Sequence, residues 1–473
     1  MAITSSTQTA FDVPKLVSQL MAVERRPIDQ LQTRVSSHEA KISSWGTLSS
    51  LVSTFQSATK TLGGSLEKLA ATSSDTGAFT ASAASNAVPG SYSVSVNKLA
   101  QAQNLVAAGQ ASSSTAIGDG SATTLTFEFG TISGGTLTDG IYSGASFTAN
   151  GSGPASITID SSNNTLEGIR DAINAANLGV TATLVNDGST TPYRLALTST
   201  STGETQSMRI STSGGDGSIG ALLNYDPAGT QNLSQTQAAQ NAALKVNGIA
   251  ITSATNTVSD AIQGVTLSLK NTTAAPATLA VARDTAAITA AATSFVDAYN
   301  AMASQMKSRF AYGSKTTAAG ALAGDGTLRT MQEQLRGIFN TPATGGTLTA
   351  LAQVGISMQK DGSLALDSGK LTNALATNHS DVVNLFNSPS GFATRFDAWA
   401  KETVNPGGLI DTRTTNLKSN VSNFNTEIDR LENRMAALER KYTKEYTNLN
   451  MLLSSMNTTS TYLTQQLSGS STK

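Results

Sequence analysis

Few side chains in this sequence could perform acid–base or metal chemistry, and their spacing argues against both. The two histidines, His38 and His379, lie far apart in the chain, and there is no cysteine. Neither an HExxH motif nor a paired Cys/His spacing occurs, so no zinc site is expected. We therefore expect both histidines to be packing or surface residues, and no cofactor or metal to be bound.

A glycine pattern in residues 215–220, GDGSIG, matches the GxGxxG spacing of dinucleotide-binding loops. That fingerprint requires a following helix long enough to present its N-terminus to a pyrophosphate. Pro227 would end such a helix early, and no acidic residue stands about 20 positions further on. We interpret these residues as a turn. The sequence contains neither a Walker A loop nor a GxSxG nucleophile elbow.

The remaining candidates for chemistry are scattered. Asp160, Glu167 and Asp171 stand among turn and helix-start residues, where capping of backbone N–H groups explains them. Trp45 and Trp399 are too isolated to form a stacking platform and are expected in cores. The sequence therefore predicts a protein without enzymatic activity.

Composition narrows the class further. The 473 residues are 39% hydrophobic and 5% aromatic, with 31 basic and 32 acidic residues. A chain of this length suits about three domains. The near-zero net charge predicts no binding to nucleic acid or anionic lipid. No apolar run is long enough to insert into a membrane, and the first residues lack the features of a cleavable secretory signal.

The expected secondary structure places helices at both ends of the chain and strands in the middle. Helical spacing runs through residues 11–69 and returns over 286–399, where it is interrupted by a hairpin at 356–366. Between residues 79 and 284, short alternating runs are separated by Gly, Ser, Asn and Pro, which is typical of strands and turns. Residues 165–185 and 258–269 each suggest a short helix, a glycine and a strand.

The strongest physical signal is a seam of apolar residues near the C-terminus. No Gly or Pro occurs from Leu409 to Ser468, and apolar residues recur there in alternating steps of four and three. A repeat of about 3.5 residues predicts left-handed supercoiling against a partner helix. The predicted self-assembly seam comprises Leu417, Val421, Phe424, Ile428, Leu431, Met435, Leu438, Tyr442, Leu449, Leu452, Met456 and Leu463, and a matching N-terminal helix seam comprises Ile28, Leu31, Val35, Ile42, Trp45 and Val52.

Four segments carry a family resemblance. Residues 16–31 (LVSQLMAVERRPIDQL), 90–103 (GSYSVSVNKLAQAQ) and 450–467 (NMLLSSMNTTSTYLTQQL) resemble the flagellar filament cap family, also called hook-associated protein 2. Residues 161–185 are similar to an insertion motif shared by flagellins and hook-associated proteins. The resemblance is strong at both ends of the chain and weak in residues 107–155.

The resemblance implies a structural protein at the distal tip of the bacterial flagellum. Such caps are homo-oligomers, commonly pentamers or hexamers, that promote polymerisation of flagellin, prevent its leakage and are needed for motility. The implied route is flagellar type III export, with a cytoplasmic export chaperone and the hook-associated junction protein as further partners. Two alternatives remain open: an adhesin displayed at the tip, and another axial protein such as the hook–filament junction.

The resemblance and the residue pattern together predict an α+β multidomain fold. Coiled-coil helices at the two ends and a helical domain would enclose nested β-rich insertions. The predicted boundaries are 1–42 with 409–473 for the terminal helices, 43–78 with 284–408 for the helical domain, 79–108 with 239–283 for a β-rich domain, and 109–238 for an outer β-rich domain.

Overall fold

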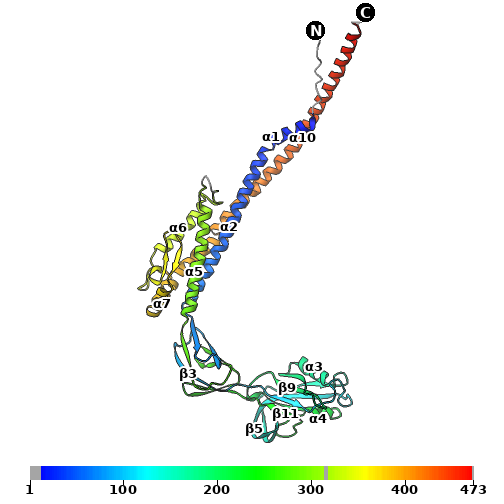
Figure 1. Cartoon of the computed structure of the whole chain (residues 1–473), viewed down its shortest axis with the longest axis vertical. Helices are drawn as coiled ribbons and strands as arrows, with labels where there is room; N and C mark the ends of the chain where they lie inside the picture. Colours follow the sequence, from blue (N-terminus) through cyan, green and yellow to red (C-terminus); the bar gives the residue numbers. More distant parts are fainter. Residues whose placement is uncertain (1–11, 314–317, 471–473) are drawn as a thin grey trace. The chain divides into compact units, whose positions relative to one another are not determined.

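The computed structural model describes residues 12–313 and 318–470 and has the predicted α+β architecture, with a helical unit and a β-rich unit (Figure 1). The helical unit is built from the chain up to Leu66 and from Thr285 onward, and the β-rich unit spans Glu67–Asp284. The helical unit thus combines two distant parts of the sequence, and the β-rich unit is one continuous block inserted between them. Each has hydrophobic cores of its own.

The helical unit contains eight helices, a short 3-10 turn and one small hairpin among the described residues. They are α1 (Val13–Glu24), α2 (Arg26–Ser65), α5 (Thr285–Phe310), α6 (Gly326–Asn340), the 3-10 turn Leu351–Val354, β17 (Ile356–Met358), β18 (Leu364–Leu366), α7 (Ser368–Thr377), α8 (His379–Asn387), α9 (Phe392–Val404) and α10 (Leu409–Ser470). The long α10 helix and the hairpin at residues 356–366 are as predicted.

The main core of the helical unit forms where α2, α5 and α9 meet. Phe55 of α2 lies at its centre, fully buried, with ring centroids 5.3 Å from both Phe295 and Phe396. Trp45 and Trp399 belong to the same core, which confirms that they are packing residues. Because aromatic side chains bury large apolar areas, this cluster fixes the middle of α2 firmly.

Local sequence signals explain where α1 and α2 begin. Asp12 caps α1 by accepting a hydrogen bond from the Lys15 amide at 3.2 Å. Pro14 and Pro27 each stand within the first two positions of a helix, where the missing N–H costs nothing.

The inner part of the β-rich unit is a sandwich of two antiparallel sheets around one core. The five-stranded sheet has the order β1 (Leu69–Ser73), β16 (Ala277–Arg283), β3 (Gly90–Lys98), β12 (Ala242–Val246) and β13 (Ile249–Ser253). The three-stranded sheet has the order β14 (Thr257–Ile262), β15 (Val265–Leu269) and β2 (Phe79–Ala83). Alternate residues such as Val94 and Val96 point into the core, as expected for sheets with one solvated face.

The outer part, within residues 104–237, has a second core between two four-stranded sheets. One sheet joins β10 (Ser207–Gly214), β5 (Thr123–Thr138) and β6 (Ile141–Ala149), with β7 (Ala155–Ile159) also paired to β5. The other has the order β11 (Leu233–Gln237), β4 (Asn104–Ala107), β9 (Tyr193–Ser199) and β8 (Val180–Asn186). Short helical elements connect them: α3 (Leu166–Ala176), the 3-10 turn Glu204–Gln206 and α4 (Ser218–Leu223).

Two sequence interpretations of this unit have different outcomes. Residues 165–185 form the predicted helix and strand, with Thr165 capping α3 and Gly179 in the left-handed region at φ +82°. In residues 258–269 the predicted strand at 265–269 is confirmed as β15, but the short helix expected before it is wrong, because residues 257–262 form strand β14, joined to β15 by a turn at Gly264. Strand β15 supplies backbone hydrogen bonds that a short helix would have formed internally, so tertiary pairing overrides local spacing.

The predicted turn holds for residues 215–217 of the GDGSIG segment, whereas residues 218–220 begin helix α4. Gly217 adopts φ +88° and precedes α4, which has only six residues.

The structure divides the units after Leu66, earlier than the predicted boundary at residue 79, because β1 pairs with β16 at the end of the β-rich unit. The finer four-part division remains a prediction.

Candidate functional site: the helical seam

The predicted seam residues lie on α10 and α2, which run side by side for much of their length (Figure 1). They divide into three groups by exposure. Buried members are Ile28, Trp45, Val52, Leu417 and Met435; half-buried members are Leu31, Val35, Ile42, Val421, Phe424, Ile428, Leu431, Leu438 and Tyr442; exposed members are Leu449, Leu452, Met456 and Leu463.

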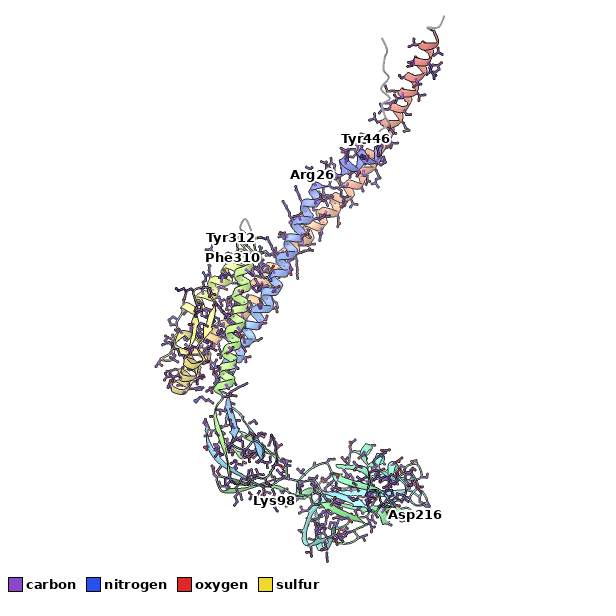
Figure 2. All side chains as sticks on the ribbon, in the orientation of Figure 1. Arg26, Lys98, Asp216, Phe310, Tyr312 and Tyr446 are labelled. Carbon is purple, nitrogen blue, oxygen red and sulfur yellow. The ribbon has the colours of Figure 1, made fainter. Side chains whose placement is uncertain are left out.

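The covered part of the seam belongs to two separate clusters. Trp45, Val52 and Leu417 are part of the main helical core. Ile28 and Met435 instead join a small terminal cluster with Val13, Val17 and Met21 of α1, and Tyr446 is the C-terminal-most residue of α10 in it (Figure 2). The apolar seam of α10 up to Tyr446 is therefore covered within the chain itself, because α1 and α2 pack against it.

The sequence interpretation missed the contribution of α1. Val13, Val17 and Met21 recur every four residues, which is the spacing of one helix face. The signal was present, but Pro14 suggested a helix start rather than a buried stripe. Tyr446 was also missed, because it falls outside the four–three alternation; its ring centroid lies 6.5 Å from that of Tyr442.

Beyond this cluster the seam is uncovered. The exposed fraction is 42% for Leu449, 57% for Leu452, 60% for Met456 and 54% for Leu463. The same helix carries further exposed apolar side chains at Met451, Tyr462 and Leu467. An exposed apolar surface that is continuous with a packed one marks an interaction site.

Polar contacts align the helices around the seam. The Arg413 guanidinium of α10 donates two hydrogen bonds to one carboxylate oxygen of Asp325, at 3.0 and 2.9 Å. Asp325 is almost fully buried and also caps α6, its other oxygen accepting from the Thr327 amide at 2.9 Å. Nearer the terminal cluster, Arg25 forms an ion pair with Glu432. Both charges of this second pair are well exposed, so it contributes only about 0–1 kcal/mol.

The two histidines have packing environments. The His38 ring meets Phe424 edge-on, with centroids 5.3 Å apart, between α2 and α10. Burial, with Lys41 and Arg413 nearby, lowers the pKa of His38, so the ring is neutral at physiological pH. His379 lies at the start of α8, where its Nε2 is 2.8 Å from the Leu66 carbonyl oxygen. Within the described residues no group of three or more His, Asp or Glu side chains could hold a metal ion.

Comparison with known proteins decides the family. The sequence matches the model of the flagellar hook-associated protein 2 N-terminus over residues 9–103 and that of its C-terminus over residues 239–458. It is 33% identical to flagellar hook-associated protein 2 of Escherichia coli K12, over 98% of this chain and 97% of that protein. The chain belongs to the flagellar hook-associated protein 2 family.

Further similarities agree with this assignment. The B-type flagellar hook-associated protein 2 of Pseudomonas aeruginosa is 31% identical over 94% of this chain and 93% of its own. Residues 146–201 match the flagellin hook IN motif. Among solved structures, the D1-D2-D3 domains of the flagellar cap protein FliD from E. coli align with a TM-score of 0.65 and 34% identity, covering 79% of this chain and 99% of that one. The family predicted from four sequence segments is thus confirmed.

Membership of the hook-associated protein 2 family places this chain at the flagellum, among structural proteins. Across the ranges 12–313 and 318–470, no helix combines the length and apolarity needed to span a bilayer.

Proposed function

We propose that this chain caps the distal end of the bacterial flagellar filament, where it promotes polymerisation of exported flagellin and prevents flagellin from leaking away. The observation that carries this proposal is the similarity to hook-associated protein 2 over nearly the whole chain, with a solved relative described as a flagellar cap protein. In this role the chain acts by binding and positioning subunits, without catalysis and without a cofactor.

The seam supplies the physical basis for assembly into a cap. Its covered part holds the terminal helices together, while Leu449, Leu452, Met456 and Leu463 present apolar surface to solvent. Burying such a side chain contributes roughly 1.5–3 kcal/mol, and a ring of copies multiplies that gain. We infer a homo-oligomer of five or six copies in which the exposed seam contacts neighbouring chains.

The proposal includes the partners and route that the family resemblance implies. The chain leaves the cell unfolded through the flagellar type III pathway, with a cytoplasmic chaperone before export. At the tip it contacts flagellin, and the hook-associated junction protein is a further partner. The absence of cysteine suits a protein that must fold outside the cell without disulfide formation.

The two alternatives are not favoured. The family models that match residues 9–103 and 239–458, and the relatives described above, are those of hook-associated protein 2, which gives no support to a hook–filament junction protein. An adhesive role of residues 109–238 has no support in the same comparisons.

A deletion strain tests the proposed function directly. Without this protein, cells should release monomeric flagellin into the medium and carry no filaments, and a plasmid copy should restore both filaments and swimming. Normal filaments in the deletion strain, with no flagellin in the medium, would contradict the capping role. Sedimentation of the purified full-length protein should in addition show species larger than a monomer.

A further inference from the structure

The inner β sandwich leaves one side open. Strand β13 ends the five-stranded sheet and β14 ends the three-stranded sheet, and these two edges lie on the same side. A groove of about 820 Å³ lies between them. Edge strands expose unpaired backbone groups, and natural sheets normally protect such edges with charges, prolines or bulges. The two edges here differ in that respect.

Strand β13 has an unprotected edge. It joins β12 through the turn Asn247–Gly248, both residues at positive φ, and Val246 pairs with Ile249. In such a two-residue hairpin the pair next to the turn is hydrogen-bonded and the following pair is not. The amide and carbonyl of Ala250 therefore point away from β12, towards the open edge. The strand, IAITS, contains no proline or charged residue.

Strand β14, in contrast, is protected by a bulge. Thr257 and Val258 pair with β15, and the ladder resumes only at Ile262. The intervening residues 259–261 leave the ladder, which prevents this strand from serving as a regular edge. The turn between β13 and β14 is held in place by the Thr202 hydroxyl, which donates to the Ala254 carbonyl at 2.7 Å. In this groove, β13 can therefore pair with an added strand, whereas β14 cannot.

The lining of the groove defines what it can accept. Ile249 and Val88 are 69% and 53% exposed, Ile251 is half-buried, and the buried core residues Val258 and Ile262 also line the groove. Asp260 is the one charged residue among those that line it, and no ion pair joins it to a described residue. The groove therefore favours aliphatic side chains and a single positive charge.

We propose that this groove binds an extended segment of another polypeptide, which adds to β13 as a sixth strand. Its backbone would pair with Ala250 and Thr252, its alternate aliphatic side chains would enter the groove, and a lysine or arginine would face Asp260. A five-residue strand spans about 17 Å, which matches β13. Strand addition of this kind takes its affinity from main-chain hydrogen bonds and its specificity from the pockets for alternate side chains.

Charge argues against a second copy of this chain as the occupant. No lysine or arginine occurs in the described edge strands β1, β2, β6, β7, β8, β11, β13, β14, β17 and β18. Edge strand β10 contains Arg209, but that guanidinium already pairs with Glu128. The described strand edges of a second copy therefore offer no free positive charge for Asp260, and the proposed occupant is a segment of a different protein. This inference goes beyond the capping role and does not depend on it.

Fluorescence anisotropy with the full-length protein tests the proposal. The probe is a labelled octapeptide with valine and threonine in alternation and one terminal lysine, compared with the same peptide ending in glutamate. Ala250→Pro removes the outward amide without touching the β12 ladder, and should weaken binding by about tenfold. Ala250→Ser keeps the amide and should bind as the unchanged protein does.

A charge exchange provides the second, independent arm. Asp260→Lys should weaken the lysine peptide by about threefold to fivefold and favour the glutamate peptide instead. Circular dichroism verifies that each variant is folded, and should Ala250→Pro fail to fold, the charge exchange alone decides. Binding that is unaffected by both substitutions would overturn the proposal. So would sedimentation in which Ala250→Pro lowers the oligomeric state without peptide, because a second copy would then occupy the groove.

Discussion

Two stretches of helix α10 carry the same apolar spacing but have different surroundings. From Leu417 to Tyr446 the seam is covered by α2 and α1, and Met435 is only 4% exposed. From Leu449 onward the seam is exposed, with Met456 at 60%. The comparison teaches that one continuous heptad pattern can have two environments: the first stretch packs within one chain, and the second stays exposed to solvent, which is the part for which we propose contacts between chains.

The largest expected effect comes from charging the covered stretch. Replacing Leu431 and Leu438 together with Asp should abolish cap function, because each carboxylate would lose its hydration against the terminal cluster in every copy. Filament length and flagellin in the medium are the measurements. The matched control replaces Glu432 and Glu439 with Gln; both lie off the seam, and the Glu432–Arg25 pair is exposed, so function should persist. Normal filaments from the Asp variant would show that packing of the covered stretch is not needed for cap function.

A pair of methionines separates the two stretches most directly. Met435→Ala should weaken the packing of α1 on α10 by about 2–5 kcal/mol, whereas Met456→Ala should change stability by less than about 0.5 kcal/mol. Hydrogen exchange of the α1 amides measures the first effect, and sedimentation should show weaker self-association for the second variant alone. Equal protection in both variants would remove the distinction drawn between the stretches.

A smaller effect is expected at the polar contact between α10 and α6. Arg413→Ala leaves the carboxylate of Asp325 buried with only its capping hydrogen bond from the Thr327 amide, which should cost about 1–3 kcal/mol. Urea unfolding of the full-length protein measures the loss. As a control, Arg430→Ala removes an exposed pair with Glu427 and should cost at most about 1 kcal/mol. Similar losses for the two variants would mean that burial of Asp325 contributes nothing.

The smallest effect concerns pH. The pKa of His38 in the folded protein lies below its usual 6.5, so below about pH 6.5 the unfolded chain binds more protons and stability falls. His38→Gln should remove this contribution, so that the melting temperature falls less between neutral and mildly acidic pH. Swimming is a separate measurement, and it should survive both His38→Ala and His379→Ala. Identical pH profiles for His38→Gln and the unchanged protein would rule out a role of this ring in acid sensitivity.

The sequence was sufficient for features set by local spacing. Helix α10 follows from the absence of Gly and Pro over about sixty residues, and α3 follows from its capping Thr165 and amphipathic spacing. Features set by distant pairing were not predictable in the same way. The hairpin of β14 with β15 and the joining of β1 to β16 depend on partners that local propensity does not specify.

The candidate site shows the same division. Spacing identified the seam residues of α10. It could not show that the seam is packed only as far as Tyr446, since that depends on where α1 lies against α10. The stripe of Val13, Val17 and Met21 was readable from spacing and was overlooked. The groove beside β13 had no signature in the sequence, because it arises from the order of strands in two sheets.

The pairing of β1 with β16 has a consequence for changes of length in the chain. Leu69 lies directly opposite Arg283, so the chain enters and leaves the β-rich unit at neighbouring positions. A block whose two ends meet can be lengthened, shortened or exchanged while the helices on either side of it in sequence still join through a short connection. Residues 67–284 therefore form one inserted block, and a change of length inside that block leaves the connection between α2 and α5 unaltered.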